Sequence, residues 1–157
     1  MTELKLRRIE KKLTQQEAAK RIGVSLRSYV MYENDESKAD TVKYRFLLQE
    51  IEKINLLDEN HGILTLEQIK SICAEVFVSY QVEFCYLFGS YAKGRATEAS
   101  DVDLLIATET TGLRFYELTE SLRVALHKKV DLLDLKQLSN NEELLREVLK
   151  EGVRIYG

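Results

Sequence analysis

Proline and tryptophan are both missing from this sequence of 157 residues, and cysteine occurs only twice. Because there is no proline, segment boundaries have to be located from glycine, polar clusters and changes of hydrophobic period. Cys73 and Cys85 lack the spacing of metal ligands and lie among apolar residues, so we expect two reduced residues of the core. His61 and His127 form no cluster, and we expect surface or packing roles for them.

Long hydrophobic runs are missing as well. No run approaches the roughly 20 apolar residues that span a bilayer, and the N-terminus lacks the hydrophobic segment of a secretory signal. We therefore expect a cytoplasmic protein with no membrane partner. Hydrophobic residues make up 45% and charged residues 31% of the chain, which is typical of a globular protein with one domain or two small ones.

Net charge is small, at −3, but it is unevenly distributed. Residues 1–57 contain 12 Lys/Arg and 9 Asp/Glu, for a net charge of +3, whereas residues 58–157 contain 11 and 17, for −6. This asymmetry favours two modules with different partners. We place the domains at 1–57 and 65–157, with residues 58–62 as the linker.

Four helices are expected in the first module, at residues 4–12, 15–22, 26–33 and 40–57. Thr14, with Glu17 three residues later, fits a capping box at the start of the second helix. Gly23 is suited to end that helix, and Ser25 to cap the third. We place these residues on the apolar sides of the first and fourth helices: Leu4, Ile9 and Leu13, and Val42, Phe46, Leu47, Ile51 and Ile54.

The segment from Leu13 to Ser25, followed by Tyr29 and Tyr32, resembles a helix-turn-helix of the phage-repressor type. In such a motif the small residue Ala19 lets two helices cross closely, and the helix that begins after Ser25 can enter the major groove. The resemblance implies binding of operator DNA through phosphate or base contacts. The residues assigned to these contacts are Gln15, Ser25, Arg27 and Ser28.

Two further expectations concern the assembly of this module. A charge of +3 is modest for tight binding of DNA by a monomer, so a homodimer on paired half-sites is expected if binding is specific. The alternative to DNA binding is a helical hairpin that packs on a protein partner.

In the second module some segments have the hydrophobic period of strands and others have that of helices. We expect strands at residues 82–88, 101–107, 129–135 and 153–156, and helices at 65–80, 113–127 and 141–151. The expected fold class is α+β, with an all-α helix-turn-helix module followed by a small mixed-sheet domain.

Acidic residues cluster at the start of one expected strand. Asp101 and Asp103 are two residues apart, so on a strand both carboxylates point to the same face. Carboxylates this close repel each other unless a cation lies between them, and Mg²⁺ prefers carboxylate oxygens together with substrate phosphates. Upstream, Gly89 ends an apolar strand and allows close approach of a ligand, and the Ser90 hydroxyl can hold phosphate oxygens.

A third carboxylate is expected from the strand at 129–135. Asp131 and Asp134 are three residues apart and face opposite sides of a regular strand, so only one of them can join the site. We choose Asp131, because its neighbours Val130 and Leu132 would point into the core.

The run from Gly89 to Arg95, together with Asp101-Val102-Asp103, resembles the nucleotidyltransferase superfamily that includes DNA polymerase beta, and especially its minimal nucleotidyltransferases. The resemblance covers residues 65–157. It implies a palm domain in which Asp101, Asp103 and Asp131 are catalytic and hold two Mg²⁺ ions. It also implies that ATP, as the donor substrate, is contacted by Gly89, Ser90, Lys93 and Arg95. The departure is Tyr91, which stands where the family has its first basic residue.

Minimal nucleotidyltransferases of this size are similar to the antitoxins of HEPN toxin–antitoxin pairs. The resemblance implies transfer of AMP from ATP to a tyrosine hydroxyl of a HEPN toxin, with the helix-turn-helix repressing the operon. Two alternatives remain open at this stage. One is a non-catalytic DNA-binding regulator that senses nucleotide, and the other is a nucleotidyltransferase that acts on a small molecule or an RNA end.

Overall fold

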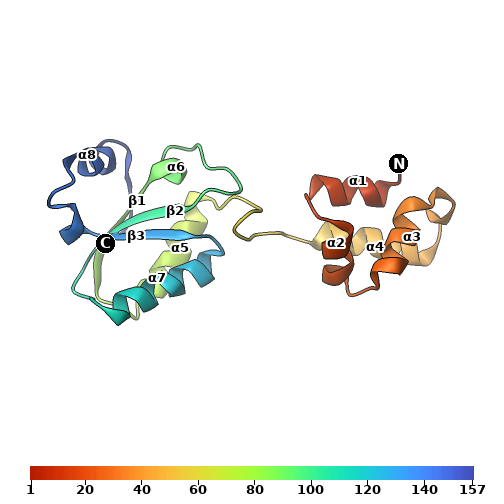
Figure 1. Cartoon of the computed structure of the whole chain (residues 1–157), viewed down its shortest axis with the longest axis horizontal. Helices are drawn as coiled ribbons and strands as arrows, with labels where there is room; N and C mark the ends of the chain where they lie inside the picture. Colours follow the sequence, from red (N-terminus) through yellow and green to blue (C-terminus); the bar gives the residue numbers. More distant parts are fainter. The chain divides into compact units, whose positions relative to one another are not determined.

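The computed structural model describes Met1–Gly157, and the chain divides into two compact units, Met1–Leu56 and Leu57–Gly157. The first unit is entirely helical and the second combines helices with a sheet of four strands (Figure 1). The expected α+β class is therefore confirmed, with the all-α module first. No helix is both long and apolar enough to cross a membrane.

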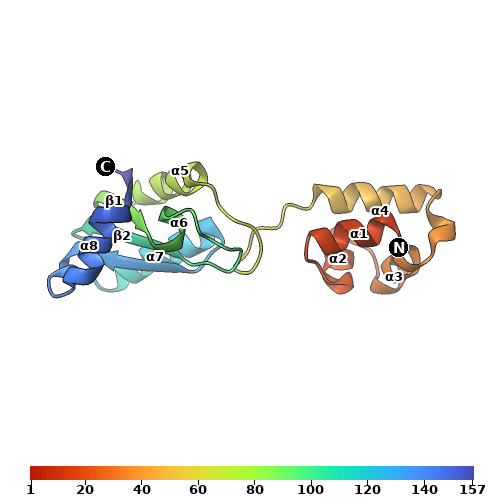
Figure 2. The same cartoon turned by 90° about the horizontal axis from the view of Figure 1, so that it is seen from above.

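The first unit contains α1 (Glu3–Glu10), α2 (Gln15–Ile22), α3 (Leu26–Asn34), the short 3₁₀ helix η1 (Glu36–Lys38) and α4 (Val42–Lys53) (Figure 2). The caps predicted from the sequence are present. Thr14 and Glu17 form a capping box, Gly23 adopts a left-handed conformation with φ of +85°, and the Ser25 hydroxyl accepts the backbone N–H of Ser28. These local signals are what separate α2 from α3.

The apolar face predicted for the fourth helix is partly wrong. Val42 is 80% exposed and Phe46 45% exposed, whereas Tyr44 is buried together with Leu47 and Ile51. The Tyr44 hydroxyl accepts the backbone N–H of Leu4, so its polar group has a hydrogen-bond partner while the ring is buried in the core. The helix is also shorter than expected, since it runs from Val42 to Lys53. In α1 the predicted core residue Ile9 is 47% exposed.

A buried ion pair joins the first and third helices. The Glu33 side chain is fully buried, and its two oxygens accept hydrogen bonds of 2.8 and 2.9 Å from the Arg8 guanidinium. Gln15 adds a third bond of 3.1 Å. Burial acts to raise the pKa of Glu33, but the hydrogen bonds from Arg8 and Gln15 outweigh it and hold this pKa below its ordinary value. The carboxylate therefore ties three helices together.

We predict that Arg8→Met lowers the free energy of unfolding by about 3 kcal/mol, because it leaves a buried carboxylate without its partner. Urea denaturation of the full chain, followed by helical circular dichroism, measures this. Since the folded state depresses the pKa of Glu33, its stabilisation is present above the ordinary glutamate value of about 4.3 and is lost as pH falls below it. Arg7→Met is the matched control, because Arg7 forms only exposed ion pairs and its loss should change the midpoint little.

The second unit contains α5 (Leu66–Phe77), β1 (Val82–Phe88), α6 (Gly89–Ala92), β2 (Val102–Thr108), α7 (Leu113–Leu126), β3 (Val130–Asp134), η2 (Leu135–Leu138), α8 (Glu142–Glu151) and β4 (Val153–Tyr156). The strand order is β3-β2-β1-β4. Strand β1 is antiparallel to both β2 and β4, while β2 and β3 are parallel and are joined through α7. The predicted mixed sheet is confirmed.

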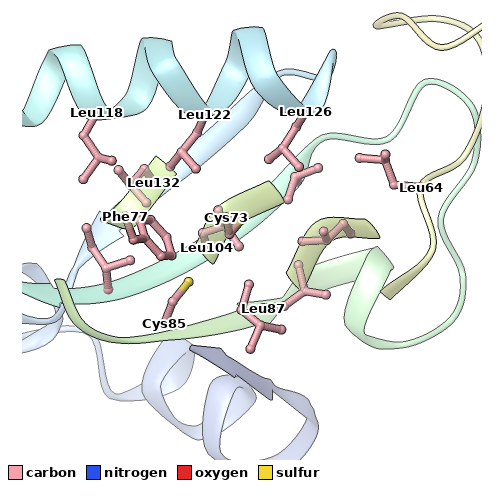
Figure 3. Packing of buried hydrophobic residues seen from close by; sticks show 14 residues of the cluster. Leu64, Cys73, Phe77, Cys85, Leu87, Leu104, Leu118, Leu122, Leu126 and Leu132 are labelled. Carbon is pink, nitrogen blue, oxygen red and sulfur yellow. The ribbon is translucent and has the colours of Figure 1, made fainter. Parts of the chain in front are cut away.

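Each face of this sheet packs against different helices. Helices α5 and α7 cover one face, where Leu118, Leu122 and Leu126 form a row along α7 above the strands (Figure 3). Cys73 and Cys85 lie in this core as free thiols, which confirms their predicted role. Helix α8 and η2 cover the other face over a smaller cluster of Phe88, Leu105, Leu138 and Val148.

Alternation along the strands decides which face each residue joins. In β2, Val102, Leu104 and Ile106 enter the core beneath α5 and α7. Asp103 and Leu105 therefore face the side that carries α8. The smaller cluster covers this second face only in part, and the carboxylate of Asp103 lies where β2 begins.

Residues 58–62, interpreted from the sequence as a linker, are part of the second unit. Asp58 and His61 pair through their backbones and side chains, and the Gly62 N–H donates to Glu98 at 3.2 Å. The segment looked like a linker because it is polar and contains glycine. Its hydrogen bonds to residues distant in sequence could not be read from that composition.

Candidate active site

Two of the predicted acidic residues lie directly opposite each other on neighbouring strands. Asp103 of β2 pairs in register with Asp131 of the parallel strand β3. Strand alternation then places both side chains on the same face, the one that carries α8. Asp134 pairs with Ile106 instead, is buried, and caps η2 by accepting the backbone N–H of Lys136. The structure therefore brings Asp131, and not Asp134, beside Asp103.

Asp101 lies in the loop just before β2, and not within a strand as predicted. Strand alternation alone therefore does not orient its side chain, which is exposed. The loop still returns it to the sheet edge, because the next residue, Val102, donates its backbone N–H to Lys129 at 2.9 Å. Asp101 is close enough to Asp103 to raise its pKa.

Gly89 stands at the end of β1, next to Asp103. It has a φ of +69°, and a Cβ built there would collide with the Asp103 carboxylate. The sequence suggested that this glycine makes room for a ligand, and the structure shows that it makes room for a carboxylate of the same chain. Phe88, just before it, is the register partner of Asp103, and Ser90 follows it in the short helix α6.

The two basic candidates differ in what they contact. The Lys93 ammonium donates to Glu147 of α8 at 2.7 Å and lies 3.8 Å from Glu151. Arg95 is exposed, and its side chain has no ion-pair partner. Lys93 would have to exchange Glu147 for a phosphate in order to bind nucleotide, whereas Arg95 is available. The sequence offered no signal for Glu147, since α8 is distant along the chain.

Tyr91 replaces the first basic residue of the family pattern, and its environment explains the departure. The ring packs against the core beneath α5 and α7, and its hydroxyl accepts the backbone N–H of Leu64 at 3.5 Å. Burial raises the pKa of this hydroxyl. The side chain at this position therefore supports the fold and does not face the acidic residues.

The acidic residues repel each other. Burial, followed by the negative charges of Asp131 and Asp101, raises the pKa of Asp103 to about 6, and Lys93 opposes the shift. A divalent cation would relieve this repulsion, and carboxylates are the ligands that Mg²⁺ prefers. As they stand, the three carboxylates do not converge closely enough to hold a metal ion. Asp101 and Asp131 are exposed, so their side chains are not packed away from Asp103. By residue type the three donors therefore fit a magnesium site.

We predict that Asp103→Asn stabilises the metal-free protein at pH 7 by roughly 1–2 kcal/mol, since one pKa unit corresponds to about 1.4 kcal/mol and solvent screens part of the effect. Because the folded state raises the pKa of Asp103, its ionisation destabilises the fold as pH rises from about 4 to 6. The gain should therefore be absent near pH 4 and complete above pH 6. Thermal unfolding of both proteins in chelator across this range measures it. A variant that is less stable than the wild type at pH 7 would contradict the repulsion.

The residues assigned to DNA contact lie at the start of α2 and α3. Arg27 is exposed on the first turn of α3, beside Leu26, while Ser28 is half-buried. Ser25 is exposed and caps α3. Gln15 donates one amide N–H to Glu33, so its second N–H and its carbonyl oxygen are left for another partner. Arg27 is thus an exposed cation on the first turn of α3.

Comparison with known families agrees with this division of the chain. Residues 67–157 match the family described as polymerase beta, nucleotidyltransferase, and residues 4–43 match a helix-turn-helix family. The first match contains every residue of the acidic site, and the second contains every residue assigned to DNA contact.

Individual relatives point in the same direction. The chain is similar to the protein adenylyltransferase MntA of Thermococcus cleftensis, with 39% identity over an alignment of 96 residues that covers 56% of this chain and 97% of the relative. It is also similar to the protein adenylyltransferase MntA of Shewanella oneidensis, with 33% identity over an alignment of 79 residues that covers 49% of this chain and 55% of the relative.

A solved structure of a toxin–antitoxin complex with AMP-PNP has a similar fold. The match has a TM-score of 0.50 and 27% identity, and covers 56% of this chain and 73% of the other.

Proposed function

Because the chain belongs to the polymerase beta nucleotidyltransferase family and carries an N-terminal helix-turn-helix, we propose that it is an antitoxin that transfers AMP from ATP to a toxin protein. The acceptor would be a tyrosine hydroxyl of a HEPN-type toxin. The adenylyltransferase names of its relatives and the toxin–antitoxin complex of similar fold support this choice of reaction and partner.

The observation that carries the proposal is the register of Asp103 with Asp131, beside Asp101. In our proposal these three carboxylates hold two Mg²⁺ ions, which would activate the attacking hydroxyl and stabilise charge on the α-phosphate. Burial raises the pKa of Asp103, and the negative charges of Asp131 and Asp101 raise it further, which supports a site for cations. An acidic surface strand without function would not require a glycine beside its half-buried carboxylate.

The remaining residues would position the triphosphate. Gly89 and Ser90 would contact it where β1 meets α6, and Arg95 would bind its phosphates, joined by Lys93 once that residue leaves Glu147. A bond would form between the acceptor oxygen and the α-phosphorus, and the bond from the α-phosphorus to the oxygen that bridges to the β-phosphate would break, so that pyrophosphate leaves. The proton of the acceptor hydroxyl would pass to a carboxylate of the site or to water. Binding of ATP, Mg²⁺ and the acceptor at one sheet edge brings the reacting atoms together.

We predict that incubation of the chain with α-labelled ATP, Mg²⁺ and the toxin encoded beside it labels the toxin. Asp103→Asn should abolish labelling, because it removes a carboxylate of the proposed metal site. Mass spectrometry should then locate AMP on a tyrosine. The thermal midpoint of the variant must be measured in parallel, since loss of activity by unfolding would be uninformative. Labelling of RNA ends or small molecules in the absence of toxin would favour another acceptor, and no labelling at all would refute the proposal.

We also propose that the first unit binds operator DNA and so represses the toxin–antitoxin operon. Arg27, exposed on the first turn of α3, would contact a base or a phosphate, and Ser25 and Ser28 would approach the backbone. Gln15 would contribute through its second amide N–H or its carbonyl oxygen. A homodimer would let two α3 helices read paired half-sites.

We predict that Arg27→Ala weakens binding to the upstream DNA about tenfold or more, since one base contact is worth about 1–3 kcal/mol. Electrophoretic mobility shift at fixed salt measures this, with Arg45→Ala on α4 as an exposed arginine control in the same unit. Equal binding by wild type and Arg27→Ala would place DNA on another surface. Binding that depends on ATP yet survives Asp101→Asn would instead favour a nucleotide-sensing regulator.

A further inference from the structure

Lys128 is a charged residue that is entirely buried. Its relative exposure is 0%, and it lies in the bend between α7 and β3. The ammonium donates to three backbone carbonyl oxygens: those of His61 at 3.1 Å, Gly62 at 2.6 Å and Glu98 at 2.7 Å. A lysine ammonium has three donors, so each donor has one acceptor.

Burying an ammonium group costs desolvation free energy, which a residue that only filled space would not require. Burial lowers the pKa of Lys128, although the nearby carboxylates of Asp58 and Glu98 act in the opposite direction. Buried charges can often be replaced by apolar residues of similar size at no loss of stability. The side chain of Lys128 is completely shielded from solvent, in an environment where an apolar residue would be ordinary. A requirement for the three hydrogen bonds accounts for the lysine.

The hydrogen bonds hold the loop that carries Asp101. Glu98 is tied to Lys128 through its carbonyl oxygen and to the Gly62 N–H through its side chain. From Glu98 the chain reaches Asp101 through a tight turn, in which Ser100 and Thr97 exchange hydrogen bonds of 2.8 and 3.0 Å. A fixed Glu98 therefore restricts where Asp101 lies.

The residue after Lys128 holds the other side of Asp101. The Lys129 carbonyl accepts the backbone N–H of Val102 at 2.9 Å. Two residues further on, Asp131 stands opposite Asp103. One short segment, 128–131, thus anchors the loop before Asp101, pairs with the residue after it and contributes Asp131 itself.

We propose that Lys128 is a positioning residue that keeps the backbone of Asp101 beside Asp103 and Asp131, from where its exposed side chain can join theirs at a divalent cation. The inference rests on the proposed function, since it assumes that these carboxylates bind metal. Lys128 touches neither metal nor nucleotide, and acts only through the loop. Groups that orient metal ligands in this way typically contribute a factor of about 10–100 to metal affinity.

The test is Mn²⁺ binding by the full chain without nucleotide, followed by electron paramagnetic resonance of the free ion. Triphosphates chelate Mn²⁺ in solution, so their absence ensures that loss of the free-ion signal reports binding by the protein. Lys128→Met keeps the aliphatic stem and removes the three donors. We expect it to raise the dissociation constant of Mn²⁺ about tenfold, and Lys128→Arg to restore part of the affinity.

Two controls separate positioning from general loss of stability. Thr108→Val removes another buried hydrogen bond, to the Gln81 carbonyl at the opposite end of β2, and should lower stability without changing Mn²⁺ affinity. Lys129→Met removes the exposed neighbouring ammonium and should leave that affinity nearly unchanged. If Lys128→Met does not fold, Glu98→Ala loosens the same loop from its other side, and its dissociation constant should rise several-fold.

Each outcome decides. The positioning role is overturned if Lys128→Met folds and binds Mn²⁺ with wild-type affinity, or if Thr108→Val raises the dissociation constant by the same factor. Where Lys128→Met does not fold, an unchanged dissociation constant in Glu98→Ala overturns it. In each of these cases the proposed function still stands. Absence of Mn²⁺ binding by the wild type refutes the proposed function and the inference with it.

Discussion

Electrostatic repulsion among carboxylates at one edge of the sheet is the constraint around which the second unit is arranged. Asp103 and Asp131 meet because β2 and β3 are parallel and in register, and Asp101 is added from the loop before β2. Partial burial and these two charges raise the pKa of Asp103 to about 6. A chain selected only for stability would not keep this arrangement, whereas a cation beside a bound triphosphate would turn the repulsion into attraction.

Three residues around the carboxylates influence their position or their charge. Gly89 has no side chain where the Asp103 carboxylate lies, so β1 can end beside it. Lys93 offsets part of the negative charge while it is paired with Glu147 of α8. Lys128 holds the preceding loop through three backbone carbonyls, at the price of burying its own charge. None of these three residues is acidic, yet each affects the position or the electrostatic environment of the acidic residues.

The first unit contains the converse case, a buried carboxylate that has all its partners. Glu33 receives two hydrogen bonds from Arg8 and one from Gln15, and its pKa is held below the ordinary value. This network joins α1, α2 and α3 and leaves the first turn of α3 exposed. The pairing also orients Gln15, because one of its two amide N–H groups donates to Glu33. In the helix-turn-helix the buried carboxylate is stabilised by hydrogen bonds within the unit. At the proposed catalytic site the carboxylates repel each other and have no such partners in common.

The sequence by itself determined the helix caps, the four strands to within a residue and the choice of Asp131 over Asp134, because these follow from hydrogen bonds or alternation over a few neighbouring residues. It placed Val42 and Phe46 in a core that they do not enter, and it did not identify Tyr44 as buried. It also treated residues 58–62 as a linker, although Lys128 and Glu98 bind them. Only the tertiary structure shows these features and the pairing of Lys93 with Glu147. Each depends on contacts between residues more than 25 positions apart, and such contacts do not change the local sequence pattern from which helices and strands are predicted.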